Sequence, residues 1–195
     1  EKWDTKYLAP ELLLTNYNYK LLATEHGLGI FTLPIFSKLF CQELLVKLKK
    51  FTDWETDRHK TYPTNDILIE KFDTNFSKIY DSTLRNILVP ALTTLYDCPI
   101  GNFIHETFII RYRPENQAHL DIHHDSSSFT VCVTFSPENE YEGGGTYFPQ
   151  HKLTLKTAQG TATIHPGKFT HKHGVKPIIS GERYSMVSFC KLIFT

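Results

Sequence analysis

Short β-rich runs separated by turns fill the chain beyond Gly101, and they constrain its fold more than any other feature. The runs cover residues 107–112, 119–123, 129–135, 146–148, 161–164 and 184–194. Glycine, proline and asparagine interrupt them, a pattern typical of an antiparallel sandwich or barrel. The sequence therefore predicts a mainly β fold with flanking helices.

Two stretches ahead of these runs show the spacing of amphipathic helices. One begins after Ser37, a good capping residue, and runs to about Lys50; its apolar face consists of Phe40, Leu44, Leu45 and Leu48. The other spans residues 75–96 and contains Pro90, which we expect to kink it. Because a stripe at helical spacing is usually core, both helices are predicted to cover one face of the sheet.

The length of 195 residues suits one domain. We predict a single domain over residues 1–195, in which residues 1–100 form a helical support region with some strands, such as 67–72, and residues 101–195 form the core barrel. Lys plus Arg and Asp plus Glu both total 21, so no net charge favours nucleic acid. No apolar run reaches membrane-spanning length. The sequence thus predicts no nucleic-acid partner and no membrane-spanning segment.

The string His123-His124-Asp125 lies at the end of one of the β-rich runs. Side chains alternate along a strand, so His123 and Asp125 are predicted to point to one side and His124 to the other. With the distant His173 they supply two imidazoles and one carboxylate, the set that holds non-haem Fe(II) and leaves three coordination positions open. An isolated H-x-D pair is more often only a polar strand end. Zn²⁺ hydrolysis also uses three nitrogen or oxygen ligands.

Arg183 follows His173 by ten residues and begins the last strongly apolar run. A guanidinium binds a carboxylate through two parallel hydrogen bonds, so this arginine suits a dicarboxylate cosubstrate that enters the barrel. A zinc hydrolase leaves the arginine unexplained. The sequence therefore favours an iron enzyme with an acidic cosubstrate.

Several further strings resemble the catalytic domain of procollagen lysyl hydroxylases, which are Fe(II)- and 2-oxoglutarate-dependent dioxygenases. These strings are Tyr62-Pro63-Thr64-x-Asp66-Ile67, Arg111-Tyr112-x-Pro114, His123-His124-Asp125, Tyr141-Glu142-Gly143-Gly144-Gly145, His165-Pro166-Gly167, Thr170-His171-x-His173 and Gly181-x-Arg183-Tyr184. The resemblance covers nearly the whole chain, with gaps mainly at 8–30 and 97–106. It departs from the animal pattern at 119–122 and at Gly174, as a divergent or viral member of the family would.

The resemblance implies a double-stranded β-helix, the jelly-roll (cupin-like) core, with a catalytic site made of His123, Asp125, His173 and Arg183. In that family the two histidines and the aspartate hold Fe(II), Arg183 binds the far carboxylate of 2-oxoglutarate, and Tyr112 is a weaker candidate for cosubstrate binding. O₂ and ascorbate are the other implied cofactors. The implied activity is hydroxylation of peptidyl lysine to 5-hydroxylysine in collagen-like Gly-X-Lys sequences. The alternatives are a prolyl or other protein hydroxylase on the same iron site and a non-catalytic metal-binding interaction domain.

The same resemblance carries expectations about the wider protein. It implies a homodimer formed through the C-terminal region, where residues 190–195 are mostly apolar. It implies that the domain is the C-terminal part of a longer protein, with glycosyltransferase domains elsewhere, in the endoplasmic reticulum lumen if it is like the animal members. His165 and His171 are expected to be structural residues near the metal. Asp121 and Glu142 are candidate acceptors for the substrate ammonium.

Overall fold

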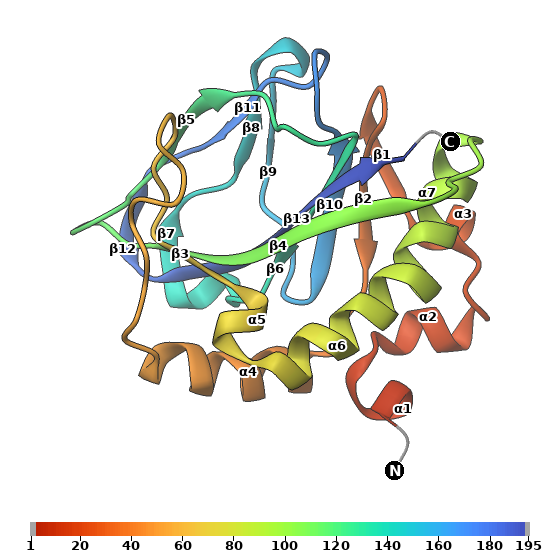
Figure 1. The fold of residues 1–195 in the computed structure, drawn as a ribbon, viewed down its shortest axis with the longest axis horizontal. Helices are drawn as coiled ribbons and strands as arrows, with labels where there is room; N and C mark the ends of the chain where they lie inside the picture. Colours follow the sequence, from red (N-terminus) through yellow and green to blue (C-terminus); the bar gives the residue numbers. More distant parts are fainter. Residues whose placement is uncertain (1–2, 194–195) are drawn as a thin grey trace.

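The computed structural model describes residues 3–193 (Figure 1). The helical segments are α1 Trp3–Tyr7, α2 Pro10–Leu14, α3 Tyr19–Leu22, α4 Lys38–Lys50, α5 Ile69–Phe72, α6 Thr74–Thr83, η1 Leu84–Leu88, α7 Val89–Tyr96, η2 Glu138–Glu140 and η3 Pro149–His151. The strands are β1 Thr24–Gly27, β2 Ile30–Pro34, β3 Asp66–Leu68, β4 Phe103–Tyr112, β5 Leu120–His123, β6 Phe129–Thr134, β7 Tyr141–Gly143, β8 Thr146–Phe148, β9 Leu153–Leu155, β10 Thr161–Pro166, β11 His173–Val175, β12 Ile178–Gly181 and β13 Arg183–Leu192. Within the described residues, none of these helices combines the length and apolar character needed to cross a bilayer.

Two antiparallel sheets form the core, which confirms the predicted jelly roll with flanking helices. The larger sheet has the strand order β1-β2-β10-β6-β13-β4-β3, and the smaller has the order β5-β11-β8-β9. The long strands β4 and β13 pair from Tyr112 and Arg183 at one end to Phe103 and Leu192 at the other. A cavity is lined by β4, β6, β10 and β13 of the larger sheet and by β5, β8 and β11 of the smaller sheet. The space between the two sheets is therefore the place for a site.

The helices cover the outer face of the larger sheet, below the strands in Figure 1. The predicted helix after Ser37 is α4, and the Ser37 hydroxyl accepts a hydrogen bond from the amide of Phe40. All members of its predicted apolar face are buried, namely Phe40, Leu44, Leu45 and Leu48. The ring of Phe40 lies 4.4 Å from that of Phe36 and 6.4 Å from that of Phe135, which follows β6. This packing occupies the outer face and leaves the inner face to the cavity.

The second predicted helix contains a wider turn just before Pro90. α6 continues into the π-helical segment η1, in which the Val89 amide bonds to the Leu84 carbonyl five residues earlier. Pro90 has no N–H to donate, and at the start of α7 it needs none. The π-turn thus keeps the proline within a continuous helical stretch, whose buried face includes Tyr80, Leu88 and Leu92.

The predicted boundaries were wrong in two elements. The strand expected over 67–72 ends at Leu68, and Ile69–Phe72 forms α5 instead. Residues three apart share one side of a helix, so Ile69 and Phe72 can both pack against the core there. In the other direction, β4 begins at Phe103, ahead of the predicted residue 107.

Candidate active site

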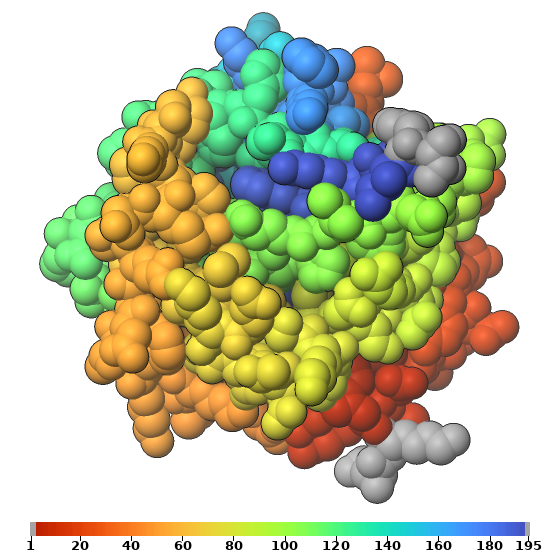
Figure 2. Space-filling model, in the orientation of Figure 1, coloured from red at the N-terminus to blue at the C-terminus, as the bar shows by residue number. Residues whose placement is uncertain are grey.

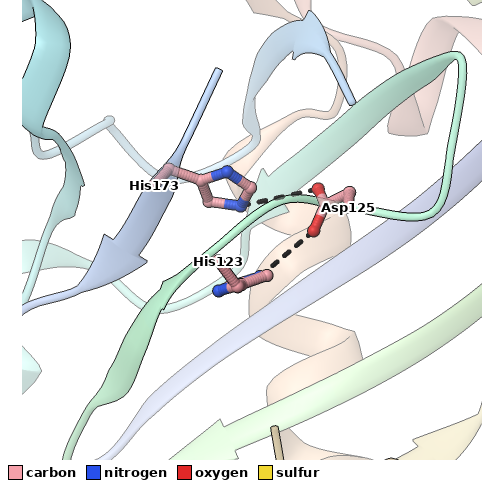
Figure 3. A group of neighbouring side chains, drawn as sticks. All are labelled: His123, Asp125 and His173. Carbon is pink, nitrogen blue, oxygen red and sulfur yellow. Dashed lines mark ion pairs between the residues drawn. The ribbon is translucent and has the colours of Figure 1, made fainter. Parts of the chain in front are cut away.

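Three side chains of the predicted metal set converge in the cavity (Figure 3). His123 ends β5 and His173 begins β11, and the two residues are partners in the antiparallel pairing of these strands. Asp125 follows His123 by two residues, and all three residues are buried. Nε2 of His123 lies 3.1 Å from Asp125 Oδ1, and Nε2 of His173 lies 3.5 Å from Asp125 Oδ2. One ligand atom from each residue lies within 4.8 Å of the other two, a spacing that can hold a metal ion.

Hydrogen bonds on the far side of each imidazole orient its ligand nitrogen. Nδ1 of His123 lies 2.7 Å from the Asp121 carbonyl oxygen, and Nδ1 of His173 lies 3.0 Å from the His171 carbonyl oxygen. Because a carbonyl only accepts, each Nδ1 carries a proton, so in the neutral form of each ring it is Nε2 that presents a lone pair. Both lone pairs then face the carboxylate, an arrangement that a cation between the three groups stabilises.

A buried hydroxyl orients the carboxylate in the same way. Thr130 on β6 donates a hydrogen bond to Asp125 Oδ2 at 2.6 Å, and its own oxygen lies 2.7 Å from the Ser127 hydroxyl. Burial alone raises the pKa of Asp125, but the imidazoles of His173 and His123 and the Thr130 hydroxyl outweigh it, so the pKa lies well below its usual range. The carboxyl is therefore ionised and ready to bind a cation.

The histidines around this carboxylate differ in their electrostatics. Burial lowers the pKa of His123, but the contact with Asp125, the Asp125 charge and the Asp121 carbonyl together outweigh burial, so the pKa lies above its ordinary value. Burial holds the pKa of His173 below its ordinary value, against the attraction of Asp125. Burial also lowers the pKa of His165 to about 3, so this third imidazole is neutral. A ligand set with ionised carboxylate and basic nitrogens on neutral rings suits a divalent transition metal.

Arg183 lies in the same cavity, which has a volume of about 310 Å³. The side chain is buried, and among residues 3–193 no carboxylate lies within ion-pairing distance of it. Its Nε is also buried without a hydrogen-bond partner among these residues. An unpaired buried cation is costly, so the geometry calls for an anionic ligand at this end of the cavity.

The surroundings of Arg183 leave room for such an anion. Tyr112, its partner across β4 and β13, lines the cavity with its ring centroid 5.6 Å from the guanidinium carbon. Burial raises the pKa of Tyr112, so its hydroxyl stays protonated and can donate. Ser185 lies on the same face of β13 two residues on, and its Oγ also lacks a partner among the described residues. Strand alternation after Arg183 is the sequence signal that could have identified Ser185.

A run of glycines shapes the turn beside this end of the cavity. Gly143, Gly144 and Gly145 have φ values of +85°, +69° and +101°, which side chains rarely adopt. A Cβ on Gly143 would lie 2.3 Å from the Pro177 carbonyl oxygen. The backbone at this string therefore approaches its neighbours more closely than a side chain would allow.

Two of the other histidines support the ligands as expected, and one does not lie where it was predicted. The ring of His165 lies 4.5 Å from that of His173, and Nε2 of His171 lies 2.8 Å from the Leu28 carbonyl oxygen. His124 was predicted to face away from the metal, but it lines the cavity, with a buried Nε2 that has no partner among residues 3–193. The prediction was wrong because β5 ends at His123, and strand alternation does not extend beyond that residue.

The two candidate acceptors for a substrate ammonium lie outside the cavity. The Asp121 side chain is 80% exposed and pairs with His119, and Glu142 lies on β7 within 3.5 Å of the Ser180 hydroxyl. The structure instead brings Tyr62 to the site, with its ring 4.9 Å from that of His123. Tyr62 comes from the irregular segment between α4 and β3, where no periodicity could have indicated its position.

Comparison with known sequences agrees with this geometry. A sequence profile of the 2OG-Fe(II) oxygenase superfamily matches residues 104–192, a range that contains the three metal-set residues and Arg183. The chain contains a 2OG-Fe(II) oxygenase domain. The cofactors of this superfamily are Fe(II), 2-oxoglutarate and O₂. The converging histidines and aspartate fit the iron, and the unpaired Arg183 fits the dicarboxylate.

Relatives of this oxygenase domain include named lysyl hydroxylases. It is 32% identical to the procollagen lysyl hydroxylase and glycosyltransferase of Acanthamoeba polyphaga mimivirus, over 97% of this chain and 22% of that protein. It is 28% identical to human procollagen-lysine,2-oxoglutarate 5-dioxygenase 2, over 96% of this chain and 26% of that protein. The predicted resemblance is confirmed, and the chain spans about a quarter of the length of these relatives.

A solved structure shares the fold of the oxygenase domain. The viral collagen prolyl hydroxylase of Paramecium bursaria Chlorella virus-1, in its 2OG complex, superposes with a TM-score of 0.62 and 19% identity, over 86% of this chain and 98% of that chain. At this identity the likeness establishes the fold alone.

Proposed function

We propose that this oxygenase hydroxylates peptidyl lysine to 5-hydroxylysine in collagen-like Gly-X-Lys sequences. The observation that carries the proposal is the combination of a convergent His123, Asp125 and His173 with the unpaired Arg183 in one cavity, in a chain 32% identical to a named lysyl hydroxylase. Ascorbate is the reductant we propose, because the resemblance implies it.

The residues of the chain have distinct parts in this reaction. Fe(II), held by His123, Asp125 and His173, would couple the decarboxylation of 2-oxoglutarate by O₂ to the insertion of one oxygen atom into a C–H bond. Arg183 binds the distal carboxylate of the cosubstrate and thereby orients its other end toward the metal set. The buried walls between the two sheets exclude water from the reacting atoms.

The first experiment identifies the hydroxylated residue. The protein is incubated with Fe(II), 2-oxoglutarate and ascorbate and with a collagen-like peptide that carries lysine in one Gly-X-Lys triplet and proline elsewhere. Tandem mass spectrometry is expected to find one added oxygen on the lysine. Oxygen on proline with lysine untouched would favour the prolyl hydroxylase alternative, and succinate release that does not depend on any peptide would support a domain without peptide hydroxylase activity.

We also propose a homodimer formed through the C-terminal region. Ile104 on β4 and Ile193 after β13 are 56% and 45% exposed, and the Ile193 amide bonds to the Asn102 carbonyl, so the two side chains lie near the same end of the sheet. Residues 194–195, which belong to the predicted interface, lie outside the described residues. Light scattering at micromolar concentration is expected to give a dimer mass, and Ile193→Glu is expected to shift it toward the monomer. A monomer mass for the unsubstituted protein would contradict the proposal.

A further inference from the structure

A lysine substrate must bring a positively charged ammonium into a cavity that has no free carboxylate. The inference about how the ammonium is bound rests on the proposed function. Lysine hydroxylated at C5 carries its ammonium two bonds from the reacting carbon. Among the described residues that line the cavity, Asp125 is the only carboxylate, and it belongs to the metal set. The segment between α4 and β3 even adds the basic side chains of Arg58, His59 and Lys60 to the wall. A carboxylate that accepts the ammonium must therefore come from a residue just outside those that line the cavity.

Asp66 is a second buried carboxylate, directly behind this wall. It is fully buried at the start of β3, where it pairs with Ile110 of β4. Directly paired residues of antiparallel strands point to the same face of the sheet, and Ile110 lines the cavity. The carboxylate of Asp66 is thus on the cavity side of the sheet, with the Thr64 hydroxyl donating to its Oδ2.

The guanidinium of Arg58 is paired with the carboxylate of Asp66. Its Nε donates to Asp66 Oδ1 at 2.6 Å, its Nη1 donates to Glu106 Oε1 at 2.9 Å, and its guanidinium carbon lies 4.3 Å from the ring centroid of Phe108. Both Arg58 and Phe108 line the cavity that contains the metal set. Carboxylates and an aromatic face also attract an alkylammonium ion, so the groups around the Arg58 guanidinium suit a lysine ammonium as well.

The segment that carries Arg58 lies at the surface. Residues 51–65 rise beside β5 in Figure 1, and Figure 2 shows them in orange at the surface, next to the green and teal residues of the second half. Apart from one bridge residue, Glu55, the segment is irregular, and Tyr62 from it lies against the metal-set residue His123. The Arg58 side chain itself is 14% exposed, so it is mostly buried beneath this surface segment.

We propose that Asp66 is the carboxylate that binds the substrate ammonium, and that Arg58 occupies its place until the substrate enters. Glu106 gives the displaced guanidinium a partner, because it is already bonded to Nη1 and its side chain is 53% exposed. Asp66 then exchanges one cation for another and is never left as an unpaired buried charge. Asp66 is thus the residue that selects lysine over an uncharged side chain of similar length.

The alternative role for Arg58 is to hold the 51–65 segment in place, and the two roles predict opposite effects. If Arg58 competes with the ammonium, its removal strengthens the binding of a lysine peptide. If Arg58 only holds the segment, its removal weakens the binding of every peptide. The sign of the effect therefore separates the two roles.

The test measures peptide binding without turnover. The protein is loaded with Zn²⁺ and 2-oxoglutarate, and fluorescence anisotropy follows two labelled peptides that differ only in lysine or norleucine at the target position. Asp66→Asn is expected to weaken binding of the lysine peptide by about tenfold or more, the loss of one charged hydrogen bond, and to leave the norleucine peptide unchanged. Arg58→Met is expected to tighten binding of the lysine peptide by about fivefold, because the competing state is removed. Glu55→Gln, which removes a carboxylate paired with Lys71, is the control.

Each outcome decides the inference. An Asp66→Asn protein that still prefers the lysine peptide as strongly as the unsubstituted protein overturns it. An Arg58→Met protein that binds both peptides more weakly also overturns the inference. If Asp66→Asn does not fold, the Arg58→Met protein alone tests the inference. If the unsubstituted protein shows no preference for lysine over norleucine, the proposed substrate fails together with the inference. A retained preference without Asp66 refutes the inference alone.

Discussion

Replacement of Asp125 by alanine is expected to abolish metal binding and turnover while the fold is retained. Asp125 is the one carboxylate between His123 and His173, and its ionised form supplies the negative charge that offsets a divalent cation. Loss of a group that only supports a metal ligand costs about 10- to 100-fold in affinity, so loss of the ligand itself should cost at least about 100-fold. The measurements are metal content after dialysis against limiting Fe(II) and succinate release with peptide.

The matched control for this variant is Asp121→Ala. Asp121 lies as close in sequence to His123, on the other side, but its carboxylate is largely exposed and only its backbone carbonyl contacts the site. We expect this protein to bind iron normally. Circular dichroism should show the same strand content for both variants, because Asp125 lies on a cavity wall and not in the apolar core. Full activity of Asp125→Ala at low iron would refute the ligand assignment.

The sequence predicted the fold where a pattern repeats along the chain. The β-rich runs within β4 and β13 and the helical stripe of α4 are long, so these core elements were found. The strands β7, β9 and β12 have only three or four residues and were missed, because so short a run carries no measurable period. The helical spacing over 75–96 was also detected, but not the π-turn that accommodates Pro90.

The site was predictable to the extent that its residues follow from strand geometry or from motif strings. His123 and His173 are paired across two strands, and Arg183 and Tyr112 are paired across another two. His124 was misplaced because it follows the end of its strand. Arg58 could not be assigned at all: it comes from an irregular segment, and its contact with Glu106 joins positions 48 residues apart.

Arg183 is the second position where a large effect is expected. In Arg183→Lys an ammonium replaces the planar guanidinium, and an ammonium cannot form two parallel hydrogen bonds to a carboxylate. A charged hydrogen bond contributes about 1.5–3 kcal/mol, so the 2-oxoglutarate concentration needed for half-maximal turnover should rise by about 10- to 100-fold. Arg183→Met should raise it further, because no cation is left. Metal content should be unchanged in both proteins, which separates this role from that of the histidines and Asp125.

A binding measurement tests the same role without turnover. A ligand that binds only the folded state stabilises it, so Zn²⁺ with 2-oxoglutarate should raise the melting temperature of the unsubstituted protein more than Zn²⁺ alone does. Arg183→Met should lose this additional rise. Arg111→Lys is the matched control: Arg111 lies on the neighbouring β4, but it bonds to Asn65 and stacks on Trp54 and does not line the cavity. If Arg183→Met keeps the full 2-oxoglutarate response, the anion that this buried guanidinium requires is not the cosubstrate, and the cavity must bind the dicarboxylate through other donors.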